Sequence, residues 1–373
     1  MSRPRVIVCG TRFGRIYLAA FDDPRFEFEL AGILAQGSDR SRRCAAAYGV
    51  PLFTSPDELP GDIDIACVVI GGAINGGPGA VIAQELLQRG LHVLQEHPVH
   101  QAELAACLQA AGRAGRTYHL NTLFPHTEPV RRFVAAGQRL LRRQPALFID
   151  AMACCQVLYP LVDILTELLG QIRPWGFAAP AERSAIMPGL DSLDMPYRSI
   201  DGVLGGVPLS LRLQNQLDAR EPDNYAHLLH RITLGTEGGQ LTLLSTHGPV
   251  LWSPRPHMPA GMNELVRYAD DAAPHLLFAS AEPVGPAIAP TYRQILGEVW
   301  PDAVRRALTE LWAAAQARAD CRVGGQRHLT LGQVMSDLAA CTGRPEIRRH
   351  DRPPQVLPAS ILTADDHDLA GRR

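Results

Sequence analysis

The residues best suited to chemistry stand where short apolar runs give way to polar turns. The first run, residues 5–9, leads into Gly10, and Gly14 follows four residues later. A glycine turn between a strand and a helix binds pyrophosphate, because backbone N–H groups and the positive helix end point at the anion. A dinucleotide turn usually reads G-x-G-x-x-G, and Thr11 occupies the place of its second glycine here. Alone, this turn predicts either an altered phosphate site or an ordinary strand–helix connection.

The second apolar run leads into a polar loop that is rich in arginine. Where NAD-binding sheets place an acid for the ribose hydroxyls, the sequence has Gly37 and Ser38. Arg40 and Arg42 follow, and a guanidinium binds phosphate through two parallel hydrogen bonds. The loop therefore favours NADP, with its ribose 2′-phosphate. Two alternatives stay open: a solvated helix start, and Asp39 as a displaced ribose acid that would suit NAD.

A later apolar run ends in Glu96 and His97, and so places a carboxylate and an imidazole at the edge of the sheet where substrates bind. A histidine can deliver a proton near neutral pH. His100 and His126 are close enough in sequence to be alternatives, and a lone histidine is more often structural. The position at a strand end favours His97 as the proton donor.

These positions require a parallel sheet beneath them. Between residues 5 and 124, five apolar runs alternate with helical stretches, which predicts βαβ units with right-handed crossovers. The second half contains a short amphipathic helix, several strand-like segments with a glycine hairpin turn at residues 237–239, and two further helices. The fold class predicted is α/β: an N-terminal Rossmann-type parallel sheet (1–122), a C-terminal α+β domain with an open, mostly antiparallel sheet (123–345), and a flexible tail (346–373).

Composition narrows the function classes. The formal net charge is −2, which gives no reason to expect nucleic acid or an acidic membrane as a partner. The sequence has no lysine, so no side chain can form a Schiff base. Eight scattered cysteines without C-x-x-C spacing predict free thiols and no metal site. No apolar run reaches membrane-spanning length, and we expect a soluble cytoplasmic protein.

Six segments in order carry a resemblance to a known family: "VCGTRFGRIYLAAF", "GILAQGSDRS", "GLHVLQEHPVH", "NTLFP", "QVLYPLVDIL" and "HRITLGTEGGQLTLLSTHGPVLWSPR". The sequence resembles the Gfo/Idh/MocA oxidoreductases over residues 5–312, and within them the thiazolinyl imine reductases of siderophore biosynthesis of the yersiniabactin and pyochelin type. Sugar dehydrogenases of this family usually have E-K-P at the fourth strand and a histidine in the second domain. Here His97 replaces the lysine and Pro160 stands in place of the histidine.

The resemblance implies reduction of a thiazoline C=N bond to a thiazolidine by NADPH, on an intermediate bound to a carrier domain of a nonribosomal peptide synthetase. It also implies a homodimer formed through the open sheet. Hydride must reach carbon and a proton must reach nitrogen, and His97, His126 and Tyr159 are the candidate proton donors. Where the subgroup has a tyrosine, this sequence has Phe124, and His247 is a weaker candidate.

The predicted cofactor-binding residues come from the glycine turn, the arginine-rich loop, the end of the third strand and the end of the fourth. They are Gly10, Thr11, Arg12, Phe13, Gly14, Ser38, Arg40, Ser41, Arg42, Gly71, Gly72, Glu96 and His97.

Two other functions compete with imine reduction. One is an NAD(P)-dependent sugar or cyclitol dehydrogenase of the same family, which the missing lysine and the proline at residue 160 disfavour. The other is a dinucleotide sensor without catalysis, or a scaffold docked to the synthetase, which the imperfect glycine turn favours. Fluorescence titration with NADPH and NADH separates the enzymes from a scaffold that binds neither.

Overall fold

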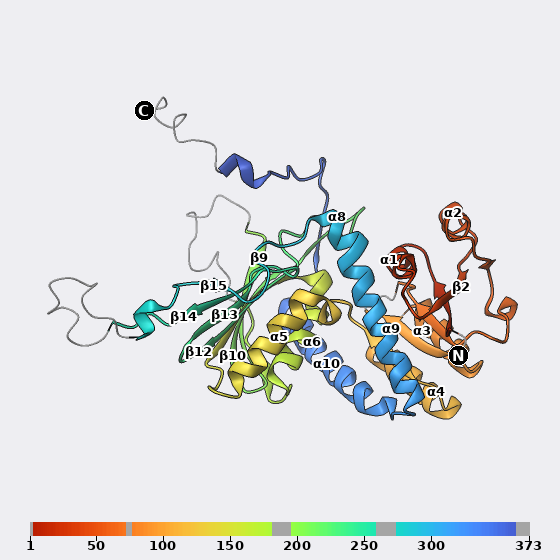
Figure 1. The fold of residues 1–373 in the computed structure, drawn as a ribbon, viewed down its shortest axis with the longest axis horizontal. Helices are drawn as coiled ribbons and strands as arrows, with labels where there is room; N and C mark the ends of the chain where they lie inside the picture. The colour runs from red at the N-terminus through yellow and green to blue at the C-terminus, as the bar shows by residue number, and fades with distance from the viewer. Residues whose placement is uncertain (1–2, 72–76, 181–194, 259–273, 363–373) are drawn as a thin grey trace.

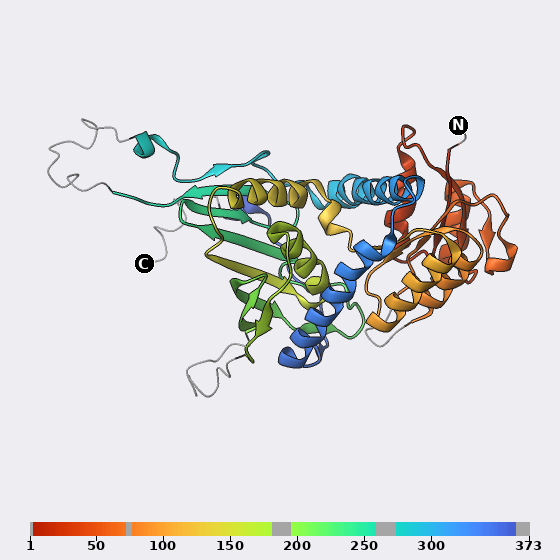
Figure 2. The same cartoon turned by 90° about the horizontal axis from the view of Figure 1, so that it is seen from below.

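The computed structural model describes residues 3–71, 77–180, 195–258 and 274–362 of the chain. The molecule is elongated, with a smaller sheet at one end and a larger sheet at the other (Figure 1). Long helices from the C-terminal part of the chain lie between the two sheets (Figures 1 and 2).

The smaller sheet is parallel and has the strand order β3-β2-β1-β4-β5-β6. Its strands are β1 (Arg5–Cys9), β2 (Glu29–Leu34), β3 (Leu52–Phe53), β4 (Ile65–Val68), β5 (His92–Glu96) and β6 (Tyr118–Asn121). Its helices are α1 (Gly14–Ala19), α2 (Asp39–Tyr48), α3 (Pro78–Gln88) and α4 (Gln101–Ala114). Every residue of β4 is buried, as in a strand covered on both faces. The strand order reverses between β1 and β4, where open α/β sheets bind their ligands.

The predicted Rossmann-type sheet is confirmed, and the structure adds one strand to it. β3 lies at the edge of the sheet and pairs only with β2, through Leu52 and Phe53. Two residues are too few to form an apolar run, so the sequence pattern did not predict this strand.

The larger sheet has eight strands in the order β15-β14-β13-β12-β7-β10-β9-β8. The strands are β7 (Phe148–Cys154), β8 (Trp175–Phe177), β9 (Tyr197–Leu204), β10 (Val207–Gln214), β12 (His230–Thr236), β13 (Gly239–Leu243), β14 (Val250–Pro254) and β15 (Glu282–Pro283). Only β7 and β10 pair in parallel, so the predicted mostly antiparallel sheet is confirmed. The predicted glycine hairpin joins β12 to β13.

Helices cover one face of the larger sheet. They are α5 (Glu128–Leu141), α6 (Leu158–Leu169) and α10 (Cys321–Thr342), and their apolar side chains share one core with the strands. α10 also contacts α4, and so reaches from the larger sheet to the Rossmann-type sheet.

A second helix from the C-terminal part packs directly on the Rossmann-type sheet. α8 (Tyr292–Gln294) and a π-helical turn (Ile295–Val299) lead into α9 (Trp300–Gln316). Val304, Leu308 and Leu311 of α9 are fully buried in the same core as Val6 and Val8 of β1. Residues after 300 therefore complete the core of a domain whose strands all lie before residue 122.

The first residues of the predicted tail, 346–348, form a strand that the sequence pattern did not predict. β16 (Glu346–Arg348) pairs in parallel with β11 (Gln216–Asp218), and His350 Nδ1 lies 2.9 Å from Asp218 Oδ2. Pairing with a strand edge depends on backbone groups, so the Pro- and Arg-rich composition of this segment did not reveal it.

The seven cysteines whose side chains are described are free thiols, the adjacent Cys154 and Cys155 among them. Within the described ranges, no helix combines the length and the apolar character that crossing a bilayer requires.

Candidate active site

The glycine turn after β1 has the geometry of a close approach between backbones. Gly10 has φ +94°, and a Cβ on it would lie 2.5 Å from the carbonyl oxygen of Val69. A Cβ on Gly14 would lie 3.4 Å from Val8 Cγ1, so the start of α1 packs tightly on β1. Thr11 is buried beside them. In the register that puts Thr11 at the second glycine, Cys9 stands at the first, and Gly10 makes the tight turn one residue later; with the close packing at Gly14, the residues fit a bound pyrophosphate.

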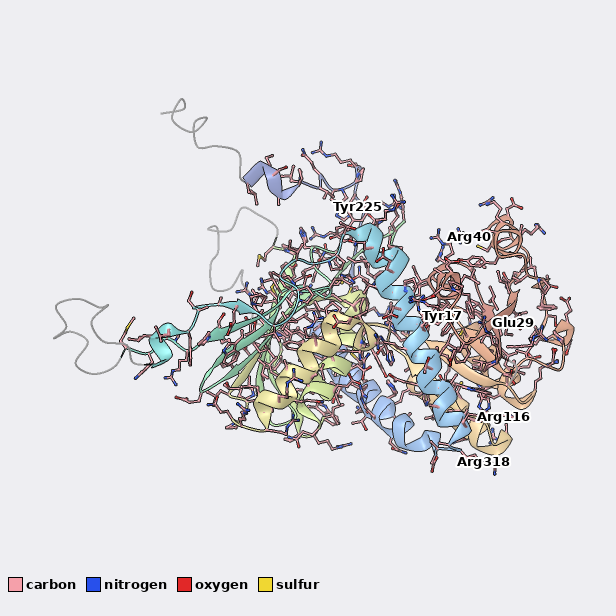
Figure 3. The ribbon with its side chains drawn as sticks, viewed as in Figure 1. Tyr17, Glu29, Arg40, Arg116, Tyr225 and Arg318 are labelled. Atoms are coloured by element: carbon pink, nitrogen blue, oxygen red, sulfur yellow. The ribbon has the colours of Figure 1, made fainter. Side chains whose placement is uncertain are left out.

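The arginine-rich loop after β2 is held by a helix cap. Ser38 is the N-cap of α2 and accepts a hydrogen bond from the Ser41 backbone N–H at 3.3 Å. The fully buried Ser41 hydroxyl donates to the Ser38 carbonyl oxygen, so Ser41 stabilises the cap. Arg42 Nη1 lies 3.7 Å from the position of a Cβ on Gly37, which places the guanidinium beside the loop that follows β2, and Arg42 Nη2 lies 3.7 Å from Asp39 Oδ1. Arg40, also on α2, is exposed (Figure 3).

This placement predicts which arginine selects the cofactor. Arg42→Ala is expected to weaken NADPH binding by about 10- to 100-fold, because charge-assisted hydrogen bonds to the 2′-phosphate are lost. NADH binding should not change. Fluorescence titration with both cofactors measures the two affinities. Arg113→Ala, which removes an exposed arginine from the last turn of α4, is the control for net charge. An equal loss of NADPH and NADH affinity would contradict the prediction.

The end of β5 carries the most connected polar group of the site. Glu96 Oε1 lies 2.9 Å from His97 Nδ1, and Glu96 Oε2 accepts hydrogen bonds from the Tyr17 hydroxyl and from Asn121 Nδ2. Glu96 is buried. Tyr17 lies within the Rossmann-type domain, as Figure 3 shows. A carboxylate that accepts from Nδ1 leaves the other ring nitrogen, Nε2, available for a reacting group.

The other two predicted proton donors are engaged with neighbouring side chains. His126 Nδ1 lies 3.6 Å from Glu310 Oε1 of α9, and this histidine lowers the pKa of the Glu310 carboxyl. The Tyr159 hydroxyl lies 3.2 Å from His328 Nδ1 of α10, and burial raises the pKa of this hydroxyl. The Tyr159 ring stacks on the His97 ring with centroids 6.1 Å apart. Tyr159 therefore presents a ring face, and not its hydroxyl, to His97.

Two buried histidines, His230 of β12 and His247 between β13 and β14, surround Phe124, which lies three residues after the end of β6. Its ring lies edge-on to His230, with centroids 5.1 Å apart, and also contacts His247. His230 Nδ1 lies 3.1 Å from Thr246 Oγ1, and His247 Nε2 accepts from the Trp300 indole N–H at 2.9 Å. Both histidines are thus held by structural contacts.

These histidines make stability depend on pH. Burial lowers the pKa of His230 and His247 to about 4, from an ordinary value of 6.5. Between pH 6.5 and 4 the unfolded chain therefore binds more protons than the folded chain. We therefore expect the free energy of unfolding to decrease as the pH is lowered from 6.5 to 4, by up to about 1.4 kcal/mol per pH unit for each histidine. Urea unfolding at several pH values measures the slope. His230→Gln should give a shallower slope, and an unchanged slope would argue against this assignment.

Trp300 joins the two domains at the site. Its ring contacts Phe13 of the glycine turn, with centroids 5.9 Å apart, and Phe124, with centroids 6.0 Å apart. The π-helical turn immediately precedes Trp300, and such turns are frequent at functional sites. Phe13 thus faces an aromatic wall built from residues far apart in the sequence.

Sequence patterns did not single out Tyr17, Asn121 or Trp300. Tyr17 and Trp300 read as ordinary apolar members of helices. Asn121 is a polar residue at a strand end, and that signal alone could have identified it. Of the predicted glycines after β4, Gly71 is exposed, and Gly72 lies outside the described residues.

The carboxylate of Asp163, on α6, is occupied by structural partners. It is buried, it accepts a hydrogen bond from Thr122 Oγ1 at 2.6 Å, and it forms an ion pair with Arg327 of α10. The neighbouring Pro160 is also buried. No acid–base pair of the kind expected in a sugar dehydrogenase forms from these residues.

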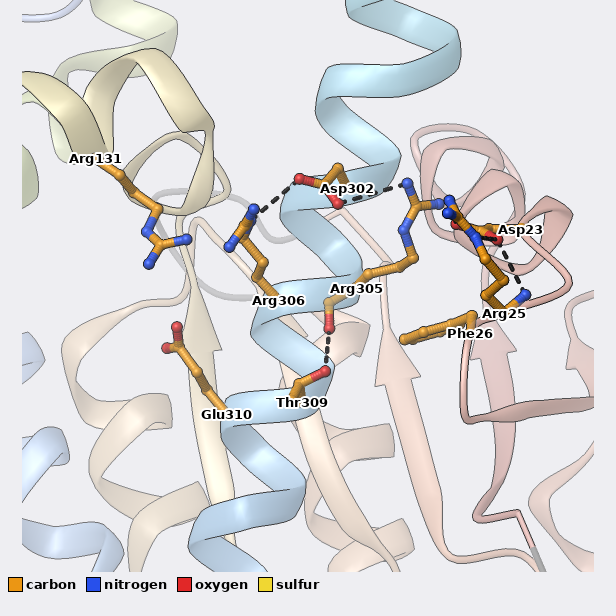
Figure 4. Close-up of a pocket in the computed structure, with 9 residues that line it drawn as sticks. All are labelled: Asp23, Arg25, Phe26, Arg131, Asp302, Arg305, Arg306, Thr309 and Glu310. Atoms are coloured by element: carbon orange, nitrogen blue, oxygen red, sulfur yellow. Dashed lines mark hydrogen bonds and ion pairs between the residues drawn. The ribbon is translucent and has the colours of Figure 1, made fainter.

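Two cavities are lined by described residues, and one of them reaches the site. The larger, of about 570 Å³, lies between α9, Arg131 of α5 and the segment after α1 (Figure 4). Arg305 and Arg306 pair there with Asp302, and no predicted site residue lines it. The other, of about 400 Å³, is lined by Glu128, Pro129, Arg132, His247, Gly248, Pro249, Pro286, Ile288, Ala289, Pro290, Gln294 and Val299. Only this second cavity reaches the site, through His247. Within the described residues, no cluster of three or more His, Cys, Asp or Glu side chains could hold a metal ion.

Solved structures share this fold. KijD10, a 3-ketoreductase from Actinomadura kijaniata in complex with NADP, is 16% identical, with 92% of this chain and 99% of that chain covered and a TM-score of 0.62. GenD2 from gentamicin A biosynthesis, in complex with NAD, is 12% identical over 90% and 93% of the chains, with a TM-score of 0.59. The UDP-N-acetylglucosamine 3-dehydrogenase GnnA from Acidithiobacillus ferrooxidans is 15% identical over 90% and 98%, with a TM-score of 0.59. At these identities the likeness concerns the fold alone.

Family models identify both parts of the chain, whereas no curated protein sequence matches it. Residues 4–122 match the oxidoreductase family Gfo/Idh/MocA with its NAD-binding Rossmann fold. Residues 144–253 match the C-terminal domain described as thiazolinyl imine reductase, Irp3-like. The chain therefore combines the NAD(P)-binding Rossmann domain of the Gfo/Idh/MocA oxidoreductases with a C-terminal domain of the Irp3-like thiazolinyl imine reductase type.

Proposed function

We propose that this oxidoreductase uses NADPH to reduce the C=N bond of a thiazoline to a thiazolidine, on a siderophore intermediate carried by a nonribosomal peptide synthetase. The match of residues 144–253 to the Irp3-like C-terminal domain is the observation that carries the proposal. Arg42, beside Gly37 in the loop after β2, supports NADPH as the cofactor. His97, at the end of β5, supports proton delivery beside the cofactor crevice.

The chemistry assigns separate roles to the cofactor and to the chain. When bound at the glycine turn after β1, NADPH would supply the hydride for the imine carbon. Glu96 orients the His97 ring through Nδ1–H, and the imidazolium form of His97 would donate its Nε2 proton to the ring nitrogen of the thiazoline, which leaves the neutral Nδ1–H ring. Phe13, Phe124 and Trp300 form an aromatic wall that excludes water and suits a neutral heterocycle.

Elimination among the neighbouring residues also favours His97. Burial keeps His230 and His247 neutral, because it lowers the pKa of each to about 4, and both have structural partners. Phe124 has no proton to give. The Tyr159 hydroxyl is engaged with His328. His97 and its carboxylate partner are the remaining pair at a strand end.

A sugar or cyclitol dehydrogenase is less well supported. Oxidation of a hydroxyl needs a base that accepts its proton, and the family's lysine and histidine are replaced by His97 and Pro160. The nearby Asp163 is neutralised by Arg327. A sensor or scaffold without catalysis has no use for an oriented carboxylate–histidine pair, and the presence of this pair therefore favours an enzyme.

Two partners belong to the proposal. The carrier domain presents the thioester substrate, and the cavity beside His247 offers space for part of it. A second subunit is proposed on the face of the larger sheet opposite α5, α6 and α10. That face exposes Ser210 and Arg212 of β10, and it carries the hydrogen-bonded pair Thr233 and Thr242. Sedimentation velocity should give a mass of about two chains.

The test uses the purified protein with NADPH and a thiazoline thioester, on a carrier domain or on a short pantetheine mimic. Absorbance at the NADPH band should fall only when the thiazoline is present, and mass spectrometry should show a product heavier by two hydrogens. The same protein with NADP⁺ and a panel of sugars and cyclitols is the comparison. Turnover of a sugar without turnover of the thiazoline would reject the proposal. Failure to bind either cofactor would favour the scaffold.

A further inference from the structure

A buried network of polar side chains ends at His97. Tyr17 lies on α1, Glu96 ends β5 and Asn121 ends β6. The Tyr17 hydroxyl donates to Glu96 Oε2 and accepts from Asn121 Nδ2 at 2.6 Å. Asn121 Nδ2 also lies 3.3 Å from Glu96 Oε2. The other carboxylate oxygen, Oε1, lies 2.9 Å from His97 Nδ1.

Burial makes these hydrogen bonds necessary. Tyr17 is 0% exposed, Asn121 1% and Glu96 8%. A buried carboxylate loses its hydration, and fixed donors must replace the lost water. Both donors face Oε2, which leaves Oε1 to accept from the imidazole. Burial and the Glu96 carboxylate raise the pKa of Tyr17 well above its ordinary value, so its hydroxyl keeps the proton that it donates.

We propose that Tyr17 and Asn121 are positioning residues, which act through Glu96 to hold the neutral His97 ring in its Nδ1–H tautomer, so that the proton it gains and donates is the one on Nε2. A carboxylate only accepts hydrogen bonds, so the ring nitrogen that faces it must carry a hydrogen. The catalytic consequence rests on the proposed function, whereas the tautomer does not. The network thereby links the first helix of the chain to the proton donor.

Asn121 also connects this network to the turn that carries Phe124. Its Oδ1 accepts from the backbone N–H of Leu123 at 3.1 Å. Leu123 is buried and has φ 59°, a conformation that a leucine adopts only when its surroundings hold it there. The amide orientation is consistent, because Oδ1 faces a donor and Nδ2 faces two oxygens. Asn121 therefore contacts both Glu96, the partner of His97, and the turn that leads to Phe124 of the aromatic wall.

Tyr118 offers a matched control. It is as buried as Tyr17, at 2% exposed, and its hydroxyl donates to Gln95 Oε1 at 2.9 Å. It lies on β6, three residues before Asn121, but its hydroxyl bonds to Gln95 and not to Glu96. The other titratable groups around His97 are Tyr159, which stacks on its ring, and the more distant His230 and His328, whose pKa values are lowered mainly by burial and, to a smaller extent, by His97.

The tautomer can be measured without substrate, by long-range ¹H–¹⁵N correlation spectra of the protein labelled at histidine nitrogen. Spectra at alkaline pH report neutral rings, and loss of signals in His97→Asn assigns the resonances. The wild type should show the Nδ1–H tautomer. Tyr17→Phe should shift His97 to a mixture of tautomers, and Tyr118→Phe should leave the wild-type pattern. If neither Tyr17→Phe nor Asn121→Asp changes the tautomer, the inference is wrong.

Asn121→Asp keeps the test valid if Tyr17→Phe fails to fold. This change preserves the acceptor for Leu123 and replaces the donor to Glu96 with a second carboxylate. With a thiazoline substrate, both variants should lower kcat by about tenfold, a part of what a general acid contributes. The KM for the substrate and the affinity for NADPH should not change. An unchanged kcat with a disturbed tautomer would overturn the catalytic role. Absence of imine reduction in the wild type would reject the proposed function and leave the tautomer result standing.

Discussion

His97→Gln is expected to lower kcat for thiazoline reduction by on the order of 10²-fold, the usual contribution of a positioned general acid. Glutamine keeps much of the side-chain volume but has no proton to release. The affinity for NADPH should stay near that of the wild type, because only the proton donor is lost. Stopped-flow oxidation of NADPH with saturating thioester measures the effect directly.

His126→Gln is the matched comparison, because it removes a histidine from the same region. His126 pairs with Glu310 of α9, so this variant should keep a rate near that of the wild type. If His126→Gln were the slow variant and His97→Gln the active one, the assignment of the proton donor would be reversed. Equal loss in both would indicate damage to packing, which thermal unfolding of the two variants would reveal.

Gly10→Ala should abolish measurable NADPH binding at cofactor concentrations that saturate the wild type. The added Cβ would lie 2.5 Å from the Val69 carbonyl oxygen, at a backbone angle of φ +94° that disfavours alanine. Because the clash is with backbone and not with a flexible side chain, the turn itself must move away from β4. The N–H groups that face the pyrophosphate move with it.

Gly49→Ala separates the strain of a positive φ from the clash. Gly49 has φ +63° after α2, and no atom lies within 4 Å of a Cβ placed there. This control should lose about 1 kcal/mol of stability and bind NADPH normally. Calorimetric titration of the two variants with NADPH gives the comparison. Normal binding by Gly10→Ala would show that the turn after β1 does not hold the cofactor.

Much of the Rossmann-type domain could be predicted because its signals are local. Strands buried on both faces read as continuous apolar runs, and helices between them force a parallel sheet. The short β3 was missed because its two residues form no pattern. The strand β16 was not predicted either, because its pairing with β11 depends on backbone groups and not on side-chain composition.

The candidate site could be predicted only where chemistry lies at a strand end. Glu96 and His97 stand out in the sequence for that reason. Such a pattern does not predict the direction in which a side chain points. Tyr159 was predicted as a candidate proton donor because its hydroxyl lies near the site in the sequence. In the structure this hydroxyl contacts His328 of α10, 169 residues further along the chain.

The sequence by itself determined the fold class, the glycine turn, the carboxylate–histidine pair and the family resemblance of the two domains. Only the tertiary structure decided what surrounds them. Tyr17, Asn121 and Trp300 reach the site from α1, β6 and the start of α9. The physical reason is that local periodicity records which residues are buried, whereas the partner against which each is buried is set by packing between segments distant in the chain.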